Sequence, residues 1–301
     1  MVSRRKVMVS AALLLALAGP KATWAADKPK VVATFTIIGD LVQAVGGDAV
    51  TVTTLVGPDG DAHVFEPKPS DVAAVAKADL LFANGLGMEP WLDRLTEAAD
   101  FNGTTIIASA DVTPLPFKEE ADASGGMPDD PHAFQDLSNG RLYVKAIAAA
   151  LETLAPDQAH AIAARAAMLD GEMAALDLDI KAKLGALPQA NRRILTSHDA
   201  FHYFAKAYGL DILSIQGAST ETEPSAADLA AIARQAKTGQ VKAIFLENMS
   251  NPTLAQTISS ESGVPVGGEL VADALTRPDG VAPHYLDMFK YNLAELLKVL
   301  Q

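Results

Sequence analysis

Short runs of apolar, β-branched residues alternate with segments that repeat apolar positions every three to four residues. The short runs are typical of strands buried on both faces, and the longer segments are typical of helices that cover a sheet. The pattern predicts strands at residues 30–35, 50–55, 80–83, 105–108, 193–196, 211–215, 243–246 and 264–266. Between them it predicts helices at residues 38–45, 70–76, 91–98, 201–208, 225–236 and 252–262. The predicted fold class is therefore α/β, with mostly parallel sheets flanked by helices.

One long helical segment separates the two groups of strands. Residues 156–187 are rich in Ala, Leu and Met, with Pro156 near the start and Pro188 just beyond the end. At 1.5 Å per residue this helix would extend roughly 45 Å and would couple two lobes stiffly, which argues against a wide hinge closure. Because roughly 275 residues exceed the usual size of one domain, we expect an N-terminal lobe at 26–155 and a C-terminal lobe at 188–301.

The first 25 residues follow a different pattern. Arg4, Arg5 and Lys6 precede an uncharged stretch at residues 7–19, and small residues follow it. That stretch is shorter than the roughly 20 residues that a membrane-spanning helix needs, so residues 1–25 are predicted to be a cleaved signal peptide. The paired arginines leave both the general secretory and the twin-arginine routes open. The mature protein would then be soluble in the periplasm.

Composition limits the chemistry of the mature protein. The chain contains no cysteine, which excludes disulfides, thiolate metal ligands, a cysteine nucleophile and a lipid-bearing cysteine. Cleavage after Ala25 removes four basic residues and no acid, which takes the net charge from −13 to −17. Such a surface disfavours nucleic acid and anionic lipid as partners. Any metal ion would have to be bound by imidazole and carboxylate groups.

Four residues with such groups fall in loops. His63, His198 and Asp273 each follow a predicted strand, and His132 closes an acidic, Gly/Pro-rich segment at residues 117–131. This segment is expected to be a surface loop. Open α/β sheets bind ligands beyond the carboxyl ends of their strands, which makes these four residues candidate metal ligands. A solvated loop histidine remains the alternative for His63, and His198 is comparable to it in position.

The other three histidines are weaker candidates for metal binding. His160 lies in the long helix and His284 precedes the last helix, and both are expected to face solvent. His202 forms an i, i+4 pair with His198, a spacing that can chelate zinc. Because the glutamate of a His-Glu-x-x-His motif is missing, we interpret His202 as a bystander.

Five segments, taken together, carry a resemblance to a known family. They are Asp61-Ala62-His63-Val64-Phe65-Glu66-Pro67, Asn84-Gly85-Leu86-Gly87-Met88-Glu89-Pro90-Trp91, Asp130-Pro131-His132, Thr196-Ser197-His198-Asp199-Ala200-Phe201 and Asp273-Ala274-Leu275. In this order they resemble the ZnuA/TroA-like solute-binding proteins of zinc and manganese ABC importers. Within that family the chain is most similar to the AztC-type zinc-binding proteins, and the resemblance covers essentially the whole mature chain.

The resemblance implies two lobes joined by a long rigid helix, with a metal ion in the cleft between them. It implies that His63, His132, His198 and Asp273 bind the ion and that an ABC transporter permease receives it; we expect a monomer. In manganese- and iron-selective members the position of His198 is often glutamate, so the resemblance favours Zn²⁺. Ligand chemistry agrees in direction, because imidazole suits zinc while manganese prefers carboxylate oxygen.

Two departures from the family pattern concern the segment around His132. The preceding loop is acidic where many zinc-binding relatives have a His-rich one, and Phe134 replaces the usual Trp before an altered helix start at residues 135–138. The loop is a candidate gate of the cleft or a candidate receiver of zinc from a partner, for example a periplasmic metallochaperone. The groups that would serve are the carboxylates of Glu119, Glu120, Asp122, Asp129 and Asp130.

Three imidazoles and one carboxylate would close a tetrahedral zinc site that binds without catalysing. Because histidine has an ordinary pKa near 6.5, affinity is expected to fall as pH drops through about 6. The alternative is an exported zinc hydrolase with a three-histidine site and Asp273 as base. The sequence contains no His-Glu-x-x-His motif, nucleophile elbow or phosphate-binding glycine loop, so we predict that the protein is not an enzyme. A structural or adhesive exported protein would leave the histidines apart.

Overall fold

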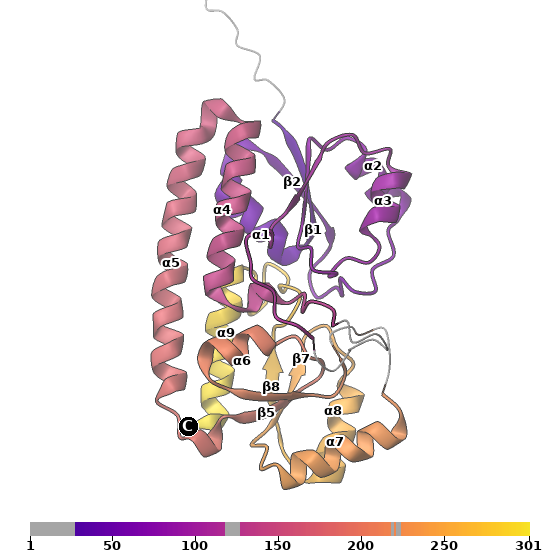
Figure 1. The fold of residues 1–301 in the computed structure, drawn as a ribbon, viewed down its shortest axis with the longest axis vertical. Helices are drawn as coiled ribbons and strands as arrows, with labels where there is room; N and C mark the ends of the chain where they lie inside the picture. The colour runs from indigo at the N-terminus through magenta and orange to yellow at the C-terminus, as the bar shows by residue number, and fades with distance from the viewer. Residues whose placement is uncertain (1–27, 118–126, 218–219, 221–223) are drawn as a thin grey trace, which may run out of the picture.

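The computed structural model describes residues 28–117, 127–217, 220 and 224–301, and these form two lobes that each contain a parallel sheet (Figure 1). The first sheet has the order β2-β1-β3-β4, with β1 Lys30–Phe35, β2 Thr51–Val56, β3 Leu80–Ala83 and β4 Thr104–Ile107. The second has the order β6-β5-β7-β8, with β5 Arg193–Thr196, β6 Asp211–Ser214, β7 Ile244–Glu247 and β8 Val266–Leu270. All strand pairings within these two sheets are parallel, which confirms the α/β prediction. The predicted signal peptide lies outside the described residues.

Most predicted strands lie within one residue of the observed ones, but the last is displaced. The pattern predicts residues 264–266, whereas β8 spans Val266–Leu270. Gly267 and Gly268 disfavour a strand by propensity. At position 267, however, a Cβ atom would lie 2.8 Å from the Cβ of Ala243, so the close approach of the backbone requires glycine.

Helices cover the sheets and connect the lobes. In the described residues they are α1 Thr36–Gly46, α2 Pro69–Val75, α3 Leu92–Ala98, α4 Leu137–Leu154, α5 Ala159–Gly185, α6 His202–Tyr208, α7 Ala226–Thr238, α8 Pro252–Ser262 and α9 Tyr285–Leu300, with 3₁₀ turns η1 Gly47–Ala49, η3 Ala133–Gln135, η4 Pro156–Gln158 and η5 Gln189–Asn191. The hydrophobic pattern did not predict α4. This helix begins after Asp136, whose side chain accepts a hydrogen bond from the Ser138 amide (2.8 Å) as an N-cap.

The long helix α5 is 27 residues, about 40 Å, and runs beside both lobes (Figure 1). It begins three residues later than predicted because Pro156 opens a 3₁₀ turn before it. The helix packs against α1 and α4 in the first lobe and against α6 and α9 in the second. It therefore links the two lobes, as predicted.

One apolar core extends through both lobes. Phe35 and Ile37 of the first lobe belong to the same buried cluster as Phe201, Leu270 and Phe289 of the second. A smaller cluster lies beneath α7 and α8. Separating the lobes as rigid bodies would expose this shared core to water, which is unfavourable in proportion to the apolar area exposed. In the part of the chain that the structure describes, no helix is both long enough and apolar enough to cross a membrane.

Candidate metal centre

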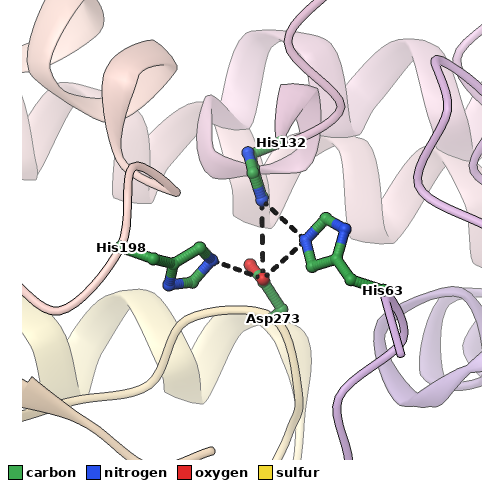
Figure 2. A group of neighbouring side chains, drawn as sticks. All are labelled: His63, His132, His198 and Asp273. Carbon is green, nitrogen blue, oxygen red and sulfur yellow. Dashed lines mark hydrogen bonds and ion pairs between the residues drawn. The ribbon is translucent and has the colours of Figure 1, made fainter. Parts of the chain in front are cut away.

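The four predicted residues come together between the lobes, where loops from both sheets meet. His63 follows β2 and His198 follows β5, while Asp273 follows β8 and His132 precedes α4. One ligand atom from each residue lies within 4.8 Å of the others, and all four side chains are buried. Figure 2 shows them pointing toward one common point.

Three separations among the ligand atoms fit a tetrahedral ion. The Nε2 atoms of His63 and His132 are 3.2 Å apart, and each lies 3.4 Å from Oδ2 of Asp273. His198 Nε2 is closer to this oxygen, at 2.9 Å. An ion with ligands about 2.0–2.1 Å away in a tetrahedron has ligand atoms about 3.3–3.4 Å apart. Three of the distances therefore agree with such an ion.

Two buried carboxylates fix the direction of two of the imidazoles. Asp130 Oδ1 accepts hydrogen bonds from the backbone amide (2.9 Å) and the Nδ1 of His132 (2.8 Å). In the second lobe, Glu247 Oε1 accepts from the backbone amide of His198 (3.0 Å), and Oε2 accepts from its Nδ1. A proton held on Nδ1 leaves the Nε2 lone pair facing the common point, as metal-bound histidines require.

Sequence reasoning missed Glu247. It is the last residue of β7, a central strand of its sheet, and it is buried. The available signal was a charged residue that closes the apolar run 243–246 at the same edge of the sheet as His198. Asp130 was noted only as part of a motif and of the acidic loop.

The segment at residues 84–91 holds both histidine loops of the first lobe. Asn84 Nδ2 donates to the carbonyl of Pro131 (2.9 Å), the residue before His132. Trp91 Nε1 donates to the carbonyl of Ala62 (2.7 Å), the residue before His63. This segment therefore supports the loops that carry His63 and His132, but it contributes none of the four converging side chains.

Glu89 stabilises the turn that presents Asn84. Its carboxylate accepts hydrogen bonds from Thr34 Oγ1 (2.7 Å) and from the amides of Asn84 (2.8 Å) and Gly85 (3.1 Å). Burial raises the pKa of Glu89, although these hydrogen bonds oppose the increase. Gly85 has a φ of +83°, which residues with a Cβ rarely adopt, so the turn depends on glycine.

Comparisons with known proteins identify the family of this chain. A family model described as "Zinc-uptake complex component A periplasmic" matches residues 31–299. The manganese-binding lipoprotein MntA of Halalkalibacterium halodurans is 33% identical over 88% of this chain and 86% of its own length. The chain belongs to this ZnuA family. The family expected from the sequence motifs is therefore confirmed, and membership places the protein in the periplasm as a metal-binding component of an ABC importer.

Other ZnuA-family proteins carry the names of different metals. The iron transporter lipoprotein MtsA of Streptococcus pyogenes is 30% identical and covers 90% of this chain and 88% of its own length. The structure of the periplasmic zinc-binding protein TroA from Treponema pallidum superimposes with a TM-score of 0.85 at 27% identity, covering 91% of this chain and 99% of TroA. The TroA match supports the two-lobed fold. Because the relatives are named for manganese, iron and zinc, membership of the ZnuA family does not decide the metal.

The buried carboxylates of this ZnuA-family site favour protonated histidines when no metal ion is bound. Burial lowers the pKa of His132, but the charge of Asp273 and hydrogen bonds to Asp130 and Asp273 outweigh burial and raise it to about 9. The pKa of His198 is also raised, because Glu247 and Asp273 outweigh its burial. Burial raises the pKa of Asp273, but His132 and His198 overcome this and hold it well below its usual range. A metal ion must therefore displace protons.

The remaining histidines lie outside the group of four. His202 is partly exposed, and its Nδ1 lies 3.5 Å from Asp130 Oδ2, so it contacts a residue that orients His132. His284 is exposed and pairs with Asp40 (2.7 Å), and His160 is exposed on α5.

The acidic segment before His132 is described only in part. Glu119, Glu120 and Asp122 lie outside the described residues, whereas Asp129 is exposed. Asp130 is fully buried against His132, so the expectation that its carboxylate receives zinc from a partner at the surface is wrong.

Proposed function

We propose that this protein captures Zn²⁺ in the periplasm with His63, His132, His198 and Asp273 and delivers it to the permease of an ABC importer. One observation carries the proposal: three imidazole nitrogens and one carboxylate oxygen converge in a buried site, and three of their separations agree with those around a tetrahedral ion. Such a donor set suits zinc, and the usual affinity order places zinc above manganese and iron. The same set of three histidines and one aspartate favours the AztC-type zinc binders within the family.

The closure of the site supports binding rather than catalysis. Asp273 Oδ2 lies within 3.4 Å of all three imidazole nitrogens, which supports assigning this oxygen to a corner of the tetrahedron. A zinc hydrolase would need that corner for a water molecule and would keep the aspartate beyond it as a base. The geometry and the relatives, which are metal-binding components of importers, give the hydrolase alternative no support. They give none to a metallochaperone either.

The proposal is tested by elemental analysis and by chelator competition with zinc and with manganese on residues 26–301. We expect one tightly held zinc per chain and weaker binding of manganese. The variants are His63→Ala, His132→Ala, His198→Ala and Asp273→Ala, with His160→Ala, an exposed histidine, as the matched control. Each ligand variant should weaken zinc binding by more than about a hundredfold, because replacing even supporting residues typically weakens binding 10–100-fold.

Three results would contradict this proposal. Tighter binding of manganese than of zinc would assign the site to another metal. Full zinc retention by Asp273→Ala would restore the hydrolase, because the aspartate would not be a ligand. Absence of zinc from every form, the unmodified chain included, would remove both functions.

A further inference from the structure

We infer that Gln135 is a positioning residue for Asp273: it ties the second-lobe loop that carries Asp273 to the first-lobe segment that carries His132. The inference rests on the proposed function, because it assigns Gln135 a part in retaining the ion. Gln135 belongs to the altered helix start that departs from the family pattern.

Gln135 bonds to the backbone on both sides of the lobe boundary. Its amide donates to the carbonyl of His132 (3.0 Å) within η3. Its side-chain Nε2 donates to the carbonyl of Ala272 (2.8 Å), the residue before Asp273. One fully buried side chain therefore connects the segments of two ligands that lie more than a hundred residues apart.

Asp273 depends on its backbone for its position more than two of the histidines do. Asp130 and Glu247 hold the far side of His132 and His198, respectively. By contrast, Asp273 Oδ1 is buried and has no hydrogen-bond donor among the described residues. Apart from the three imidazoles of the site, which contact Oδ2, the carboxylate is therefore directed by the anchors of its loop.

Those anchors lie on both sides of Asp273. On one side, Leu275 donates to Thr36 Oγ1 (2.8 Å) and accepts from the Asp59 amide (3.1 Å), so two bonds tie it to the first lobe. On the other side, Ala272 is joined to the first lobe through the bond from Gln135. Loss of that bond should release one end of the loop while the other stays attached.

The loop is also held by its own lobe. Asn292 bonds to both backbone groups of Val271 (2.8 Å each), and Asn248 Oδ1 accepts from the Ala272 amide (3.3 Å). Asn248 also donates to Asp59 of the first lobe (2.9 Å), so it links Ala272 to that lobe through an intermediate side chain. Gln135 makes the direct bond, and without it the segment before Asp273 would be attached to the lobe of His63 and His132 only through Asn248.

The side chain of Gln135 itself argues against a role in packing alone. Its Oε1 atom is buried without a donor in the described part of the chain, which is unfavourable. An apolar residue of similar size would fill the space without burying that acceptor, but it would leave the Ala272 carbonyl without a donor. The glutamine is therefore explained by the bond to the Asp273 loop.

The test is Gln135→Met in the mature chain, with zinc dissociation followed by stopped flow in excess chelator. Methionine keeps the volume and removes the donor, so the dissociation rate constant should rise about tenfold, with association within about twofold. The visible absorption of bound Co²⁺ should also change, because the carboxylate is displaced. The substitution should lower the melting temperature of the metal-free protein less than it lowers the melting temperature of the zinc-bound protein.

Gln43→Met is the matched control. Its Nε2 donates to the carbonyl of Gly47 (3.2 Å) within the first lobe, so the same exchange removes a similar bond away from the site. It should leave zinc dissociation unchanged. Gln135→Glu, close in shape and without a donor when ionised, should release zinc faster as Gln135→Met does, and it replaces that variant if the methionine form does not fold.

The outcomes separate the two proposals. If the unmodified chain holds zinc and both Gln135 variants release it at the unmodified rate, the inference is wrong while the zinc function stands. Equal losses of melting temperature with and without zinc, with an unchanged Co²⁺ spectrum, would also overturn it, since they describe a structural residue. If the unmodified chain holds no zinc, the proposed function fails first and the inference fails with it.

Discussion

Zinc binding should release between one and two protons per ion at pH 7. The neighbouring carboxylates raise the pKa of His132 to about 9 and also raise that of His198. Both rings bear a proton on Nε2 when they are charged, and zinc needs that nitrogen. Binding therefore favours the deprotonated rings, and it must release protons at any pH below the raised pKa values.

The magnitude follows from the pKa of His132. With a pKa of about 9, only about one His132 ring in a hundred is neutral at pH 7 in the zinc-free protein. Each unit of pH below 9 should lower zinc affinity about tenfold through this ring, and up to about a hundredfold when His198 also releases a proton. An ordinary histidine pKa predicts that affinity falls only below about pH 6, so the window from about pH 7 to 8.5 separates the two expectations.

Two assays measure this effect. Titration calorimetry at pH 7 in buffers of different ionisation enthalpy gives the number of protons released, and chelator competition from pH 6 to 8.5 gives the slope of affinity. Asp130→Asn removes one of the charges that raise the pKa of His132, so it should reduce the proton count. His160→Ala should leave it unchanged. Release of less than one proton, with affinity flat from pH 7 to 8.5, would refute the reasoning.

The same shifts predict opposite pH trends for stability. Because the pKa of His132 is raised on folding, its contribution to the zinc-free protein is complete below about pH 6.5 and is lost as pH rises to about 9. The lowered pKa of Asp273 contributes stability above about pH 4, which is lost as pH falls through the lowered value. The zinc-free melting temperature should therefore fall between about pH 6.5 and 9, while the increase produced by zinc should grow. A zinc-induced increase that shrinks over this range would contradict the assignment.

Three further substitutions test the supports of the site. Glu247→Ala should weaken zinc binding about 10–100-fold in chelator competition, because His198 loses the carboxylate that orients it; an unchanged affinity would remove this role. Trp91→Phe keeps most of the packing but removes the hydrogen bond to Ala62. Chemical denaturation should show that the free energy of unfolding falls by about 1 kcal/mol, and zinc binding should weaken severalfold. Unchanged zinc binding would show that the bond does not support the His63 loop. Gly140→Ala would place a Cβ atom 2.6 Å from Tyr285 Oη, so unfolding should lose about 1–3 kcal/mol, whereas Gly171→Ala, where a Cβ meets nothing within 4 Å, should not destabilise.

The fold and three of the four converging residues could be predicted because their signals are local, whereas His132, at the end of the acidic loop, was assigned a role from the family resemblance. Continuous apolar runs marked the parallel strands, and residues just after those runs had to lie at the carboxyl edge of a sheet. The two errors are also local. Two glycines inside β8 hid a strand that needs them for a close backbone approach. The helix α4 was missed although its buried residues Tyr143, Val144, Ile147 and Leu151 recur at helical spacing.

The supports of the site could not be predicted in the same way, because each depends on contacts between distant segments. Glu247 accepts a hydrogen bond from His198, 49 residues away in the chain, and Gln135 donates one to Ala272, 137 residues away. Neither residue type reveals its partner: a glutamate at a strand end can face solvent, and a buried glutamine can simply fill space. What distinguishes them is burial together with a partner that would otherwise lack a hydrogen bond, and only the folded chain supplies both facts. The four proposed ligands could therefore be named from the sequence, whereas the residues proposed to control how firmly zinc is held follow from contacts between segments that are distant in the chain.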